Sequence, residues 1–401
     1  MAQPDTVKLL HITTVPQTLG FLRGQVGYMC ARGFEVHALS SPGERLDAFG
    51  RKEGVATHVL AMPRRITPPH DAAALWRLRR LLRRLRPTIV HAHTPKGGLL
   101  GMLAAWLARV PVRVYHIHGL PLMTAAGLKR ALLTCTERVA CLCASHVLCV
   151  SPSIRQVAID LRLCPARKIA VLGAGTINGI DARQRFNPRS QPADARLDRR
   201  RAWGVPPEAP VIAFAGRIVR DKGVEDLVAA WGPLRMRYPH LHMVVAGEFE
   251  PQDPVSAATA HTLRSDPHIH LLGHVSDMPA VYSGVDLLVL PTYREGFPYV
   301  PMEASAMAMP VVATAVPGCV DAVVDGVTGA LVPPRDPVAL AEAIARYLDD
   351  PALRERHGQA GRQRVLRDFQ PEAIWEATYQ EYLRLLRARG LPLPTPTEAA
   401  P

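Results

Sequence analysis

The feature that most constrains the fold of this chain is a repeated alternation between short, apolar, β-rich runs and longer helical patterns. In the first half these runs cover residues 7–13, 35–39, 88–91, 112–116, 146–150 and 168–172. The alternation restarts with runs at residues 210–215, 242–246, 268–272, 286–291, 310–314 and 329–332. Because such alternation is typical of parallel strands joined by crossover helices, the chain is predicted to be α/β, with two successive doubly wound, Rossmann-like domains.

The length of the chain and its local shifts in composition predict the domain boundaries. At 401 residues the chain exceeds what one hydrophobic core normally serves, so two domains are the default. We expect residues 1–186 to form the first domain and residues 210–370 the second. Residues 187–209, rich in Pro, Arg and Asp, are interpreted as a linker with a short helix. A closing helix is expected at residues 371–390, and the tail 391–401 is predicted to be disordered.

The charge balance and the cysteines bear on the partners and the compartment. The chain has 48 Lys and Arg against 35 Asp and Glu, a net charge of +13, which favours nucleic acid, lipid headgroups or phosphorylated small molecules as partners. Its seven cysteines include no Cys-x-x-Cys pair, so we interpret them as buried thiols in a reducing cytosol. The N-terminus does not read as a signal peptide, and no apolar run reaches the ~18 residues expected of a spanning helix.

One predicted helix, at residues 71–86, is unusually basic. Its leucines form an apolar seam, Asp71 could cap its start, and eight arginines fall within residues 64–86 against this single acid. Two interpretations stay open: the solvated face of a crossover helix, or a surface that docks on an anionic membrane. Nucleic acid is not expected, because no aromatic residues alternate with the arginines for base stacking. The membrane contact would involve Arg79, Arg80, Arg83 and Arg84.

The stretch FAGRIVRDKG, residues 214–223, follows a predicted strand and leads into a helix expected to begin at about Val224. Gly216 allows a tight turn at the end of the strand, and Arg217 and Lys222 then project from the loop. A strand end, two cations and a helix N-terminus together suit an anion, and two cations five residues apart favour a diphosphate. Ordinary surface charge at a βα loop is the alternative.

A pair of carboxylates occurs in YREGFPYVPMEASAMAMPVVAT, residues 293–314. Glu295 falls in a loop after a predicted strand, and Glu303 falls in the first turns of a helix expected to begin near Tyr299 or Val300. The two acids are therefore expected to flank one pocket, where a carboxylate can accept two hydrogen bonds from the vicinal diol of a ribose or pyranose. Complementation of the helix dipole is the alternative, and it would suit Glu303 alone.

Taken in order, the pair Arg217 and Lys222 and the pattern Glu295-x7-Glu303 resemble family 4 of the retaining glycosyltransferases, which have the GT-B fold. The resemblance implies two Rossmann-like domains with an interdomain cleft, and a closing helix that crosses back to the first domain. It covers most of the chain. Four further motifs support it: Val150-Ser-Pro-Ser153, Asn178-Gly-Ile-Asp181, Val245-Ala-Gly-Glu248 and Gly326-x-Thr-Gly329.

The resemblance implies a role for each residue of the predicted donor site. Arg217 and Lys222 would hold the donor diphosphate and stabilise its negative charge as it leaves, which lowers the energy of the transition state more than that of the ground state. Glu303 would bind the nucleotide ribose, and Glu295 the donor sugar. Because the chain contains no Asp-x-Asp triplet, protein cations should replace a metal, and no cofactor is expected. The donor-binding set is completed by Gly216, His274, Val275, Gly296, Phe297, Pro298 and Val300.

The resemblance places the acceptor on the first domain. HTPKGG begins at His93 and HIHG begins at His116, each at the end of a predicted strand. A histidine near the second position faces the donor sugar in the family, which implies a catalytic role for His118. His93 and Lys96 would lie on the acceptor side, although Lys96 could equally be a plain loop lysine. A metal site built from these His-x-His pairs is a less favoured alternative, since no carboxylate or cysteine lies beside them, and we expect no metal.

The combination HTPKGG…HIHGLP resembles the subset of the family that extends lipid-linked glycans, with an undecaprenyl diphosphate sugar as the typical acceptor. This implies transfer of an N-acetylhexosamine or related hexose from a UDP-sugar during capsule or lipopolysaccharide synthesis. The enzyme would be cytoplasmic and peripheral on the inner face of the membrane, with no nucleic-acid partner. One departure is the first loop, where Gly20 and Gly24 are separated although many relatives carry a Gly-Gly pair.

Two other functions stay open at this point. A UDP-sugar epimerase can have the same double-Rossmann shape, and it would convert UDP-GlcNAc without any acceptor. A non-catalytic basic module that binds membrane or nucleic acid would show no UDP binding.

Overall fold

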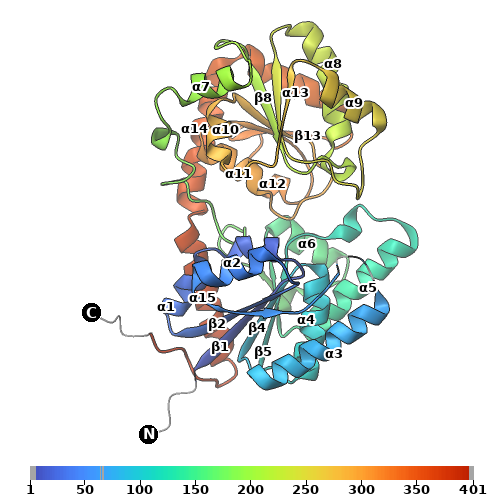
Figure 1. The fold of residues 1–401 in the computed structure, drawn as a ribbon, viewed down its shortest axis with the longest axis vertical. Coiled ribbons are helices and arrows are strands. Elements are labelled where there is room, and N and C mark those ends of the chain that lie inside the picture. The colour runs from blue at the N-terminus through green and yellow to red at the C-terminus, as the bar shows by residue number, and fades with distance from the viewer. Residues whose placement is uncertain (1–5, 64, 66, 397–401) are drawn as a thin grey trace. The chain divides into compact units, whose positions relative to one another are not determined.

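The computed structural model describes residues 6–63, 65 and 67–396, which divide into two compact units (Figure 1). Unit 1 contains the chain up to Gly179 together with the segment from Pro371 onward, and unit 2 runs from Ile180 to Gln370. Each unit is built on one parallel sheet flanked by helices. This confirms the predicted α/β class with two doubly wound, Rossmann-like domains.

The sheet of unit 1 has seven parallel strands in the order β3-β2-β1-β4-β5-β6-β7. The predicted runs correspond to six of them, whereas the edge strand β3 lies outside the prediction because its residues are not fully buried and form no apolar run. The strands are β1 (Val7–Ile12), β2 (Phe34–Ser40), β3 (Ala56–Val59), β4 (Ile89–His93), β5 (Val112–Ile117), β6 (His146–Cys149) and β7 (Ile169–Val171).

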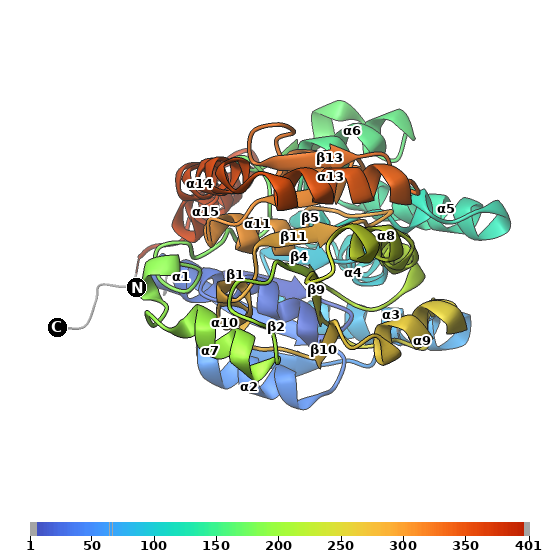
Figure 2. The same cartoon turned by 90° about the horizontal axis from the view of Figure 1, so that it is seen from above.

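The helices of unit 1 cover this sheet, and α4 lies between α3 and α5 in one row (Figures 1 and 2). The predicted leucine seam of α3 is confirmed, because Leu78 and Leu82 are buried in the core beside Leu100 and Met102 of α4. The helices are α1 (Gln25–Ala31), α2 (Glu44–Glu53), α3 (Pro68–Leu85), α4 (Pro95–Leu107), α5 (Gly127–Cys143), α6 (Pro152–Asp160) and α15 (Pro371–Arg387).

The closing helix α15 belongs to unit 1 and packs beside α1. The rings of Tyr28 and Trp375 lie 5.6 Å apart, and Arg32 donates a hydrogen bond of 3.4 Å to Glu376. The tail that follows is described as far as Pro396, and its Pro394 is buried, so the first part of the expected disordered tail has a defined place. Residues 397–401 lie outside the described residues.

The sheet of unit 2 has six parallel strands in the order β10-β9-β8-β11-β12-β13. Most of its strand residues are buried, as is typical of parallel sheets with helices on both faces. The strands are β8 (Val211–Ala215), β9 (His242–Ala246), β10 (Ile269–Gly273), β11 (Leu287–Leu290), β12 (Val311–Thr314) and β13 (Gly329–Val332). The helices are α7 (Ala195–Ala202), α8 (Val224–Arg237), α9 (Ala257–Ser265), α10 (Met278–Ser283), α11 (Tyr299–Ala306), α12 (Cys319–Ala322), α13 (Pro337–Asp349) and α14 (Pro351–Asp368).

The division between the units falls at Gly179, seven residues before the expected boundary at residue 186. Ile180 donates a backbone hydrogen bond to Phe369, which ties the start of unit 2 to its end. The expected linker, residues 187–209, contains α7 and belongs to unit 2. This segment is held within unit 2 by a buried side chain of α7.

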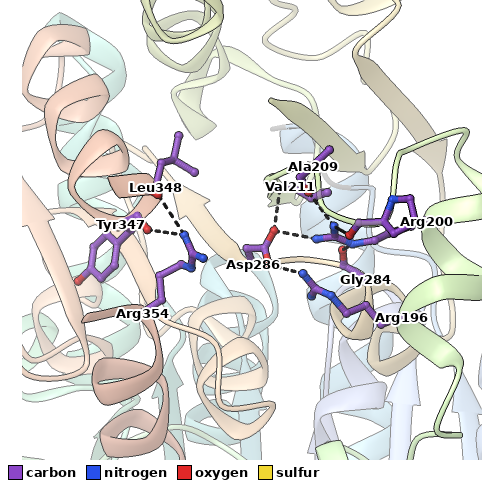
Figure 3. Close-up of polar contacts among 10 residues, drawn as sticks. Arg196, Arg200, Ala209, Val211, Gly284, Asp286, Tyr347, Leu348 and Arg354 are labelled. Carbon is purple, nitrogen blue, oxygen red and sulfur yellow. Dashed lines mark hydrogen bonds and ion pairs between the residues drawn. The ribbon is translucent and has the colours of Figure 1, made fainter. Parts of the chain in front are cut away.

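That side chain is Arg200, which is fully buried; its polar contacts are drawn in Figure 3. Its guanidinium contacts Asp286 at 2.8 Å and the carbonyl of Gly284 at 3.1 Å. Asp286 also accepts from Arg196 at 2.6 Å and from the backbone N–H of Val211 at 2.8 Å. The carboxylate thus joins α7 to the segments that lead into β8 and β11, at the edge of the sheet opposite to their carboxyl ends.

The cysteines are free, and five of them are buried, in line with the prediction of buried thiols. The two exceptions are Cys30 on α1, which is half-buried, and Cys135 on α5, which is exposed. None of the described helices is long and apolar enough to cross a membrane.

In both sheets the order of the strands reverses at one point, and ligands of doubly wound folds bind at the carboxyl ends of the strands beside such a point. In unit 2 the reversal lies between β8 and β11, and in unit 1 between β1 and β4. The two predicted donor motifs follow β8 and β11 directly. The strand order therefore brings them to the one place in unit 2 where a ligand is expected.

Candidate active site

The loop after β8 begins with a close approach of two backbones. Gly216 has φ +149, and a Cβ atom on the neighbouring Gly247 would lie 1.8 Å from the carbonyl oxygen of Gly216. The chain bends at Gly216, where a tight turn was predicted, and Ile218 then forms an isolated parallel bridge with Phe249. Arg217 then leaves the strand with half of its side chain exposed and contacts Glu250 at 2.9 Å. Its guanidinium therefore lies on the open side of the loop.

A second close approach brings this loop against the loop that follows β11. The loop makes a short 3-10 turn, Arg220–Lys222, and α8 begins at Val224, as predicted. Gly223 between them has φ +68, and a Cβ atom there would lie 1.8 Å from the carbonyl oxygen of Pro291. Only glycine fits this position, and its fit places Lys222 beside the neighbouring loop.

The two predicted motifs meet at Lys222 and Glu295, whose side chains form an ion pair. The side chains are 18% and 12% exposed, so the pair is largely shielded but reachable. A cation and a carboxylate in contact at the carboxyl ends of β8 and β11 can serve a ligand that carries both anionic oxygens and hydroxyl groups. Sequence reasoning predicted both residues, although not their direct contact.

Several residues that sequence reasoning missed hold this pair in place. Arg294 contacts Asp221 at 2.5 Å, and the backbone N–H of Tyr293 donates to the carbonyl of Asp221 at 3.0 Å. These contacts join the residue before Lys222 to the residue before Glu295. Gly318 follows β12 with φ +86, and a Cβ atom there would lie 2.5 Å from the carbonyl oxygen of Gly296. In the sequence, only the positions of Asp221 and Arg294, each directly before a predicted site residue, could have indicated this supporting role.

Glu303 lies in α11, which begins at Tyr299, as predicted. The carboxylate accepts a hydrogen bond of 3.1 Å from the hydroxyl of Tyr282 on α10. Burial raises the pKa of Glu303 to about 7, although the bond from Tyr282 and the charge of Arg185 oppose the rise. Because Glu303 is not in the first turn of α11, complementation of the helix dipole does not explain it. Sequence reasoning missed Tyr282 and Arg185.

The remaining predicted donor residues lie on the same loops. His274 is exposed and Val275 half-buried, in the loop after β10. Phe297 is buried, with its ring 5.4 Å from that of Phe369. The rest of the predicted set follows β11: Gly296 and Pro298 are buried, and Val300 is half-buried at the start of α11.

The predicted acceptor-side residues lie in unit 1. His93 is the last residue of β4 and is buried, and its Nδ1 lies 3.0 Å from Nε2 of the half-buried His118. Lys96, in contrast, is engaged by its own unit: it contacts Asp71 at 2.6 Å and donates to the carbonyl of Arg65 at 2.5 Å. These contacts agree with a structural loop lysine, and an acceptor phosphate would have to compete with them.

The basic helix α3 begins at Pro68, earlier than predicted. Asp71 accepts hydrogen bonds of 3.1 Å from the N–H and the hydroxyl of Thr67, so it braces the start of the helix from inside. Arg79 is half-buried, and its Nε is enclosed. The other three arginines assigned to membrane contact, Arg80, Arg83 and Arg84, are exposed.

Comparison with known proteins decides the family. The model for the glycosyl transferases of group 1 matches residues 196–364, and that for the glycosyl transferase 4-like domain matches residues 21–175. The capsular polysaccharide biosynthesis glycosyltransferase CapM of Staphylococcus aureus is 33% identical over 380 residues, which are 95% of this chain and 98% of CapM. The chain belongs to the group 1 glycosyltransferases.

Solved structures of glycosyltransferases share the GT-B fold of this chain. A glycosyltransferase from Rickettsia africae superposes with a TM-score of 0.78 at 18% identity, covering 96% of this chain and 99% of its own. The sucrose-phosphate synthase of Thermosynechococcus elongatus gives a TM-score of 0.77 at 23% identity, covering 95% and 100%. HepE of Anabaena, solved in complex with UDP and glucose, gives 0.77 at 20% identity, covering 94% and 99%. The predicted GT-B fold is thereby confirmed.

Proposed function

We propose that this glycosyltransferase moves a sugar from a UDP-sugar, with retention of its anomeric configuration, to a lipid-linked or cell-surface glycan. The donor sugar would be an N-acetylhexosamine or a related hexose. The observation that carries the proposal is the contact between Lys222 and Glu295 at the carboxyl ends of β8 and β11. A nucleotide sugar has the two kinds of group, anionic oxygens and hydroxyls, that such a pair can bind.

In the proposed reaction the bond from the sugar C1 to the diphosphate oxygen breaks, and a bond from C1 to an acceptor hydroxyl oxygen forms. Lys222 and Arg217 stabilise the charge that develops on the departing diphosphate, and the acceptor hydroxyl passes its proton to the departing diphosphate oxygen. Glu295 holds the hydroxyls of the donor sugar beside Lys222. The two cations are proposed to make Mg²⁺ or Mn²⁺ unnecessary at the diphosphate.

Glu303 is proposed to hold the ribose of the nucleotide. Its position on α11, and its hydrogen bond from Tyr282, give it one fixed orientation. The ionised carboxylate would accept hydrogen bonds from both ribose hydroxyls. The loop with His274 and Val275, which follows β10 on the same edge of the sheet, is proposed to contact the base. The presence of UDP in the HepE structures agrees with a UDP donor here.

The acceptor and the place of the reaction rest on unit 1 and on the relationship to CapM. The name of that relative supports a role in the synthesis of a capsular or similar polysaccharide. We propose that His93 and His118 lie on the acceptor side, and that the exposed arginines of α3 hold the enzyme on the anionic cytoplasmic face of the membrane. Exposed apolar residues of α5, Leu128 and Leu132, would add to this contact.

A panel of UDP-sugars tested against synthetic polyprenyl diphosphate sugars would test the proposal. The expected result is one preferred donor, a product with retained configuration by NMR, and full activity in EDTA. Conversion of UDP-GlcNAc to its epimer without an acceptor would contradict transfer and support an epimerase. Absence of UDP binding would support a non-catalytic module. Glu295→Gln should lower product formation while UDP binding stays close to that of the wild type.

A further inference from the structure

Unit 1 carries a cluster of histidines at the carboxyl ends of its central strands. His11 on β1 is directly opposite His91 on β4, and His93 at the end of β4 is directly opposite His116 on β5. His118 follows β5 one residue after its end. The first four are buried and His118 is half-buried. Five imidazoles at one sheet edge far exceed what packing of an apolar core requires.

We propose that His93, His116 and His118 bind a divalent transition metal ion of the zinc type. One ring nitrogen from each of the three lies within 4.8 Å of the other two. The group holds imidazoles only, a ligand set that suits zinc, copper, nickel or iron and does not suit magnesium or calcium, which require oxygen ligands. This site goes beyond the proposed sugar transfer, and it shares no residue with the donor site of unit 2.

One pair of ring nitrogens in the set is spaced almost as in a metal-bound pair. Nδ1 of His93 and Nε2 of His118 lie 3.0 Å apart. Two imidazole nitrogens, each ~2.0–2.1 Å from a tetrahedral zinc ion, are separated by about 3.3 Å. A shift of a few tenths of an ångström would therefore convert this contact from a hydrogen bond into joint ligation.

The outward-facing nitrogens of the proposed ligands have the partners that metal-bound histidines need. Nε2 of His93 lies 3.0 Å from Nδ1 of His11, and Nδ1 of His116 lies 3.3 Å from Nε2 of His91. His91 in turn contacts the hydroxyl of Tyr382 at 2.5 Å. Such outer contacts orient the rings and fix which nitrogen is left for the metal.

Two nitrogens in the cluster, Nε2 of His11 and Nε2 of His116, are unexplained by hydrogen bonding among the described residues, and the second belongs to the proposed ligand set. Nε2 of His116 is buried and has no hydrogen-bond partner among the described residues. A buried polar atom of this kind normally has a partner. A metal ion on this nitrogen would supply one, while Nδ1 of the same ring donates to His91.

The three proposed ligands differ in their exposure: the rings of His93 and His116 are buried, and that of His118 is half-buried. Because His118 is the one ligand that is not fully buried, the fourth position of the ion would face the open side and take water, as in three-histidine zinc sites.

A second set, His11, His91 and His93, meets the same distance limit. All three of its members are buried, so it offers no open side for the entry of an ion or for a fourth ligand. The set that includes His118 is therefore the better candidate.

The test is metal analysis of the full-length, tag-free protein. After incubation with ZnCl₂ and gel filtration, one equivalent of Zn²⁺ per chain is expected, and Co²⁺ should give the visible absorption of a tetrahedral nitrogen site. His93→Asn and His116→Asn should abolish both signals. His91→Gln, which removes the outer partner of His116, should weaken Zn²⁺ binding about tenfold and not abolish it.

The matched control lies in unit 2, where Nδ1 of His242 and Nε2 of His270 are also 3.0 Å apart but belong to no converging set of three among the described residues. His270→Asn should leave the metal content unchanged. Circular dichroism and the melting temperature show which variants remain folded, and Co²⁺ titration of His91→Gln keeps the test valid if a ligand variant misfolds. Wild-type protein that retains no metal and shows no Co²⁺ band, or ligand variants that bind as well as the wild type, would overturn the proposal and leave a hydrogen-bonded chain of histidines.

Discussion

Two carboxylates eight residues apart have different surroundings in this protein, and their surroundings predict different effects. Glu295 contacts a cation, whereas Glu303 accepts a hydrogen bond from the neutral hydroxyl of Tyr282, and both residues are half-buried. A substitution at Glu295 therefore disturbs a charge pair. A substitution at Glu303 disturbs a half-buried acid whose pKa is raised to about 7.

Replacement of Lys222 by alanine should lower kcat/KM by about 10²–10³-fold, the usual cost of removing one fixed group that stabilises developing charge. Arg220 in the same turn is the matched control, since its side chain is 58% exposed and contacts Glu225 at 3.8 Å. Arg220→Ala should stay near the wild-type value in steady-state assays. Equal losses in both variants would show that loss of charge in this loop, and not the position of Lys222, explains the effect.

The raised pKa of Glu303 predicts a pH dependence of stability. In the folded protein this pKa is about 7 against an ordinary value of 4.5, so between these two values the folded state binds one more proton than the unfolded state. The stabilisation is complete below pH 4.5 and is lost as the pH rises through 7, with a total of roughly 3 kcal/mol.

Urea unfolding of the wild type and of Glu303→Gln across this pH range measures the effect. The free energy of unfolding of the wild type should fall relative to that of the glutamine variant as the pH rises from 4.5 to 7. Parallel curves for the two proteins would contradict the raised pKa. Tyr282→Phe removes the hydrogen bond that lowers this pKa, so its curve should fall at a higher pH than that of the wild type.

At the scale of elements, the sequence predicts those helix and strand positions that are marked by a local pattern of residues. The helix starts at Val224 and Tyr299 are as predicted, because a loop rich in glycine or proline marks each of them. The edge strand β3 lies outside the prediction because a half-buried strand needs no continuous apolar run. The contact of Tyr282 with Glu303 could not be predicted, because it depends on how α10 packs beside α11. The number of residues between two positions in the sequence does not determine how closely two helices pack.

Gly223 lets the loop before α8 approach the loop after β11 and so positions Lys222. Gly223→Ala should therefore both destabilise unit 2 and lower activity. The added Cβ would meet the carbonyl of Pro291 at 1.8 Å in addition to the strain of φ +68. Gly204→Ala separates the two causes, because Gly204 has φ +70 with open space around it. The control should lose only about 1–2 kcal/mol and keep its activity. Thermal unfolding and assays of both variants give the comparison, and equal behaviour would show that the clash does not matter.

The exposed arginines of α3 predict membrane binding that depends on charge. Replacement of Arg80, Arg83 and Arg84 by glutamine should weaken binding to anionic vesicles by about 3 kcal/mol, roughly two orders of magnitude in partitioning. The matched triple lysine variant keeps the charge and should bind nearly as well as the wild type. Vesicle sedimentation measures both. If the glutamine variant binds like the wild type, α3 is only a solvated face of unit 1.

At the scale of the whole molecule, the two units repeat one architecture and differ in what lies at the reversal of strand order. In unit 2 the loops after β8 and β11 bring together a cation and a carboxylate. In unit 1 the strands β1, β4 and β5 bring together histidines. The alternation in the sequence predicts both sheets, but it cannot predict which side chains converge, because that depends on strand order and register.

Hydrogen exchange of the full chain should therefore respond to two ligands in two separate places. UDP should protect backbone amides in residues 216–224 and 291–303, because loops that hold a bound diphosphate and ribose open less often. Zn²⁺ should protect the ends of β4 and β5 and leave the loops of unit 2 unchanged. Lys222→Ala should reduce only the response to UDP, and His116→Asn only the response to Zn²⁺. Protection by UDP that is confined to unit 1 would contradict the donor site, whatever the outcome with zinc.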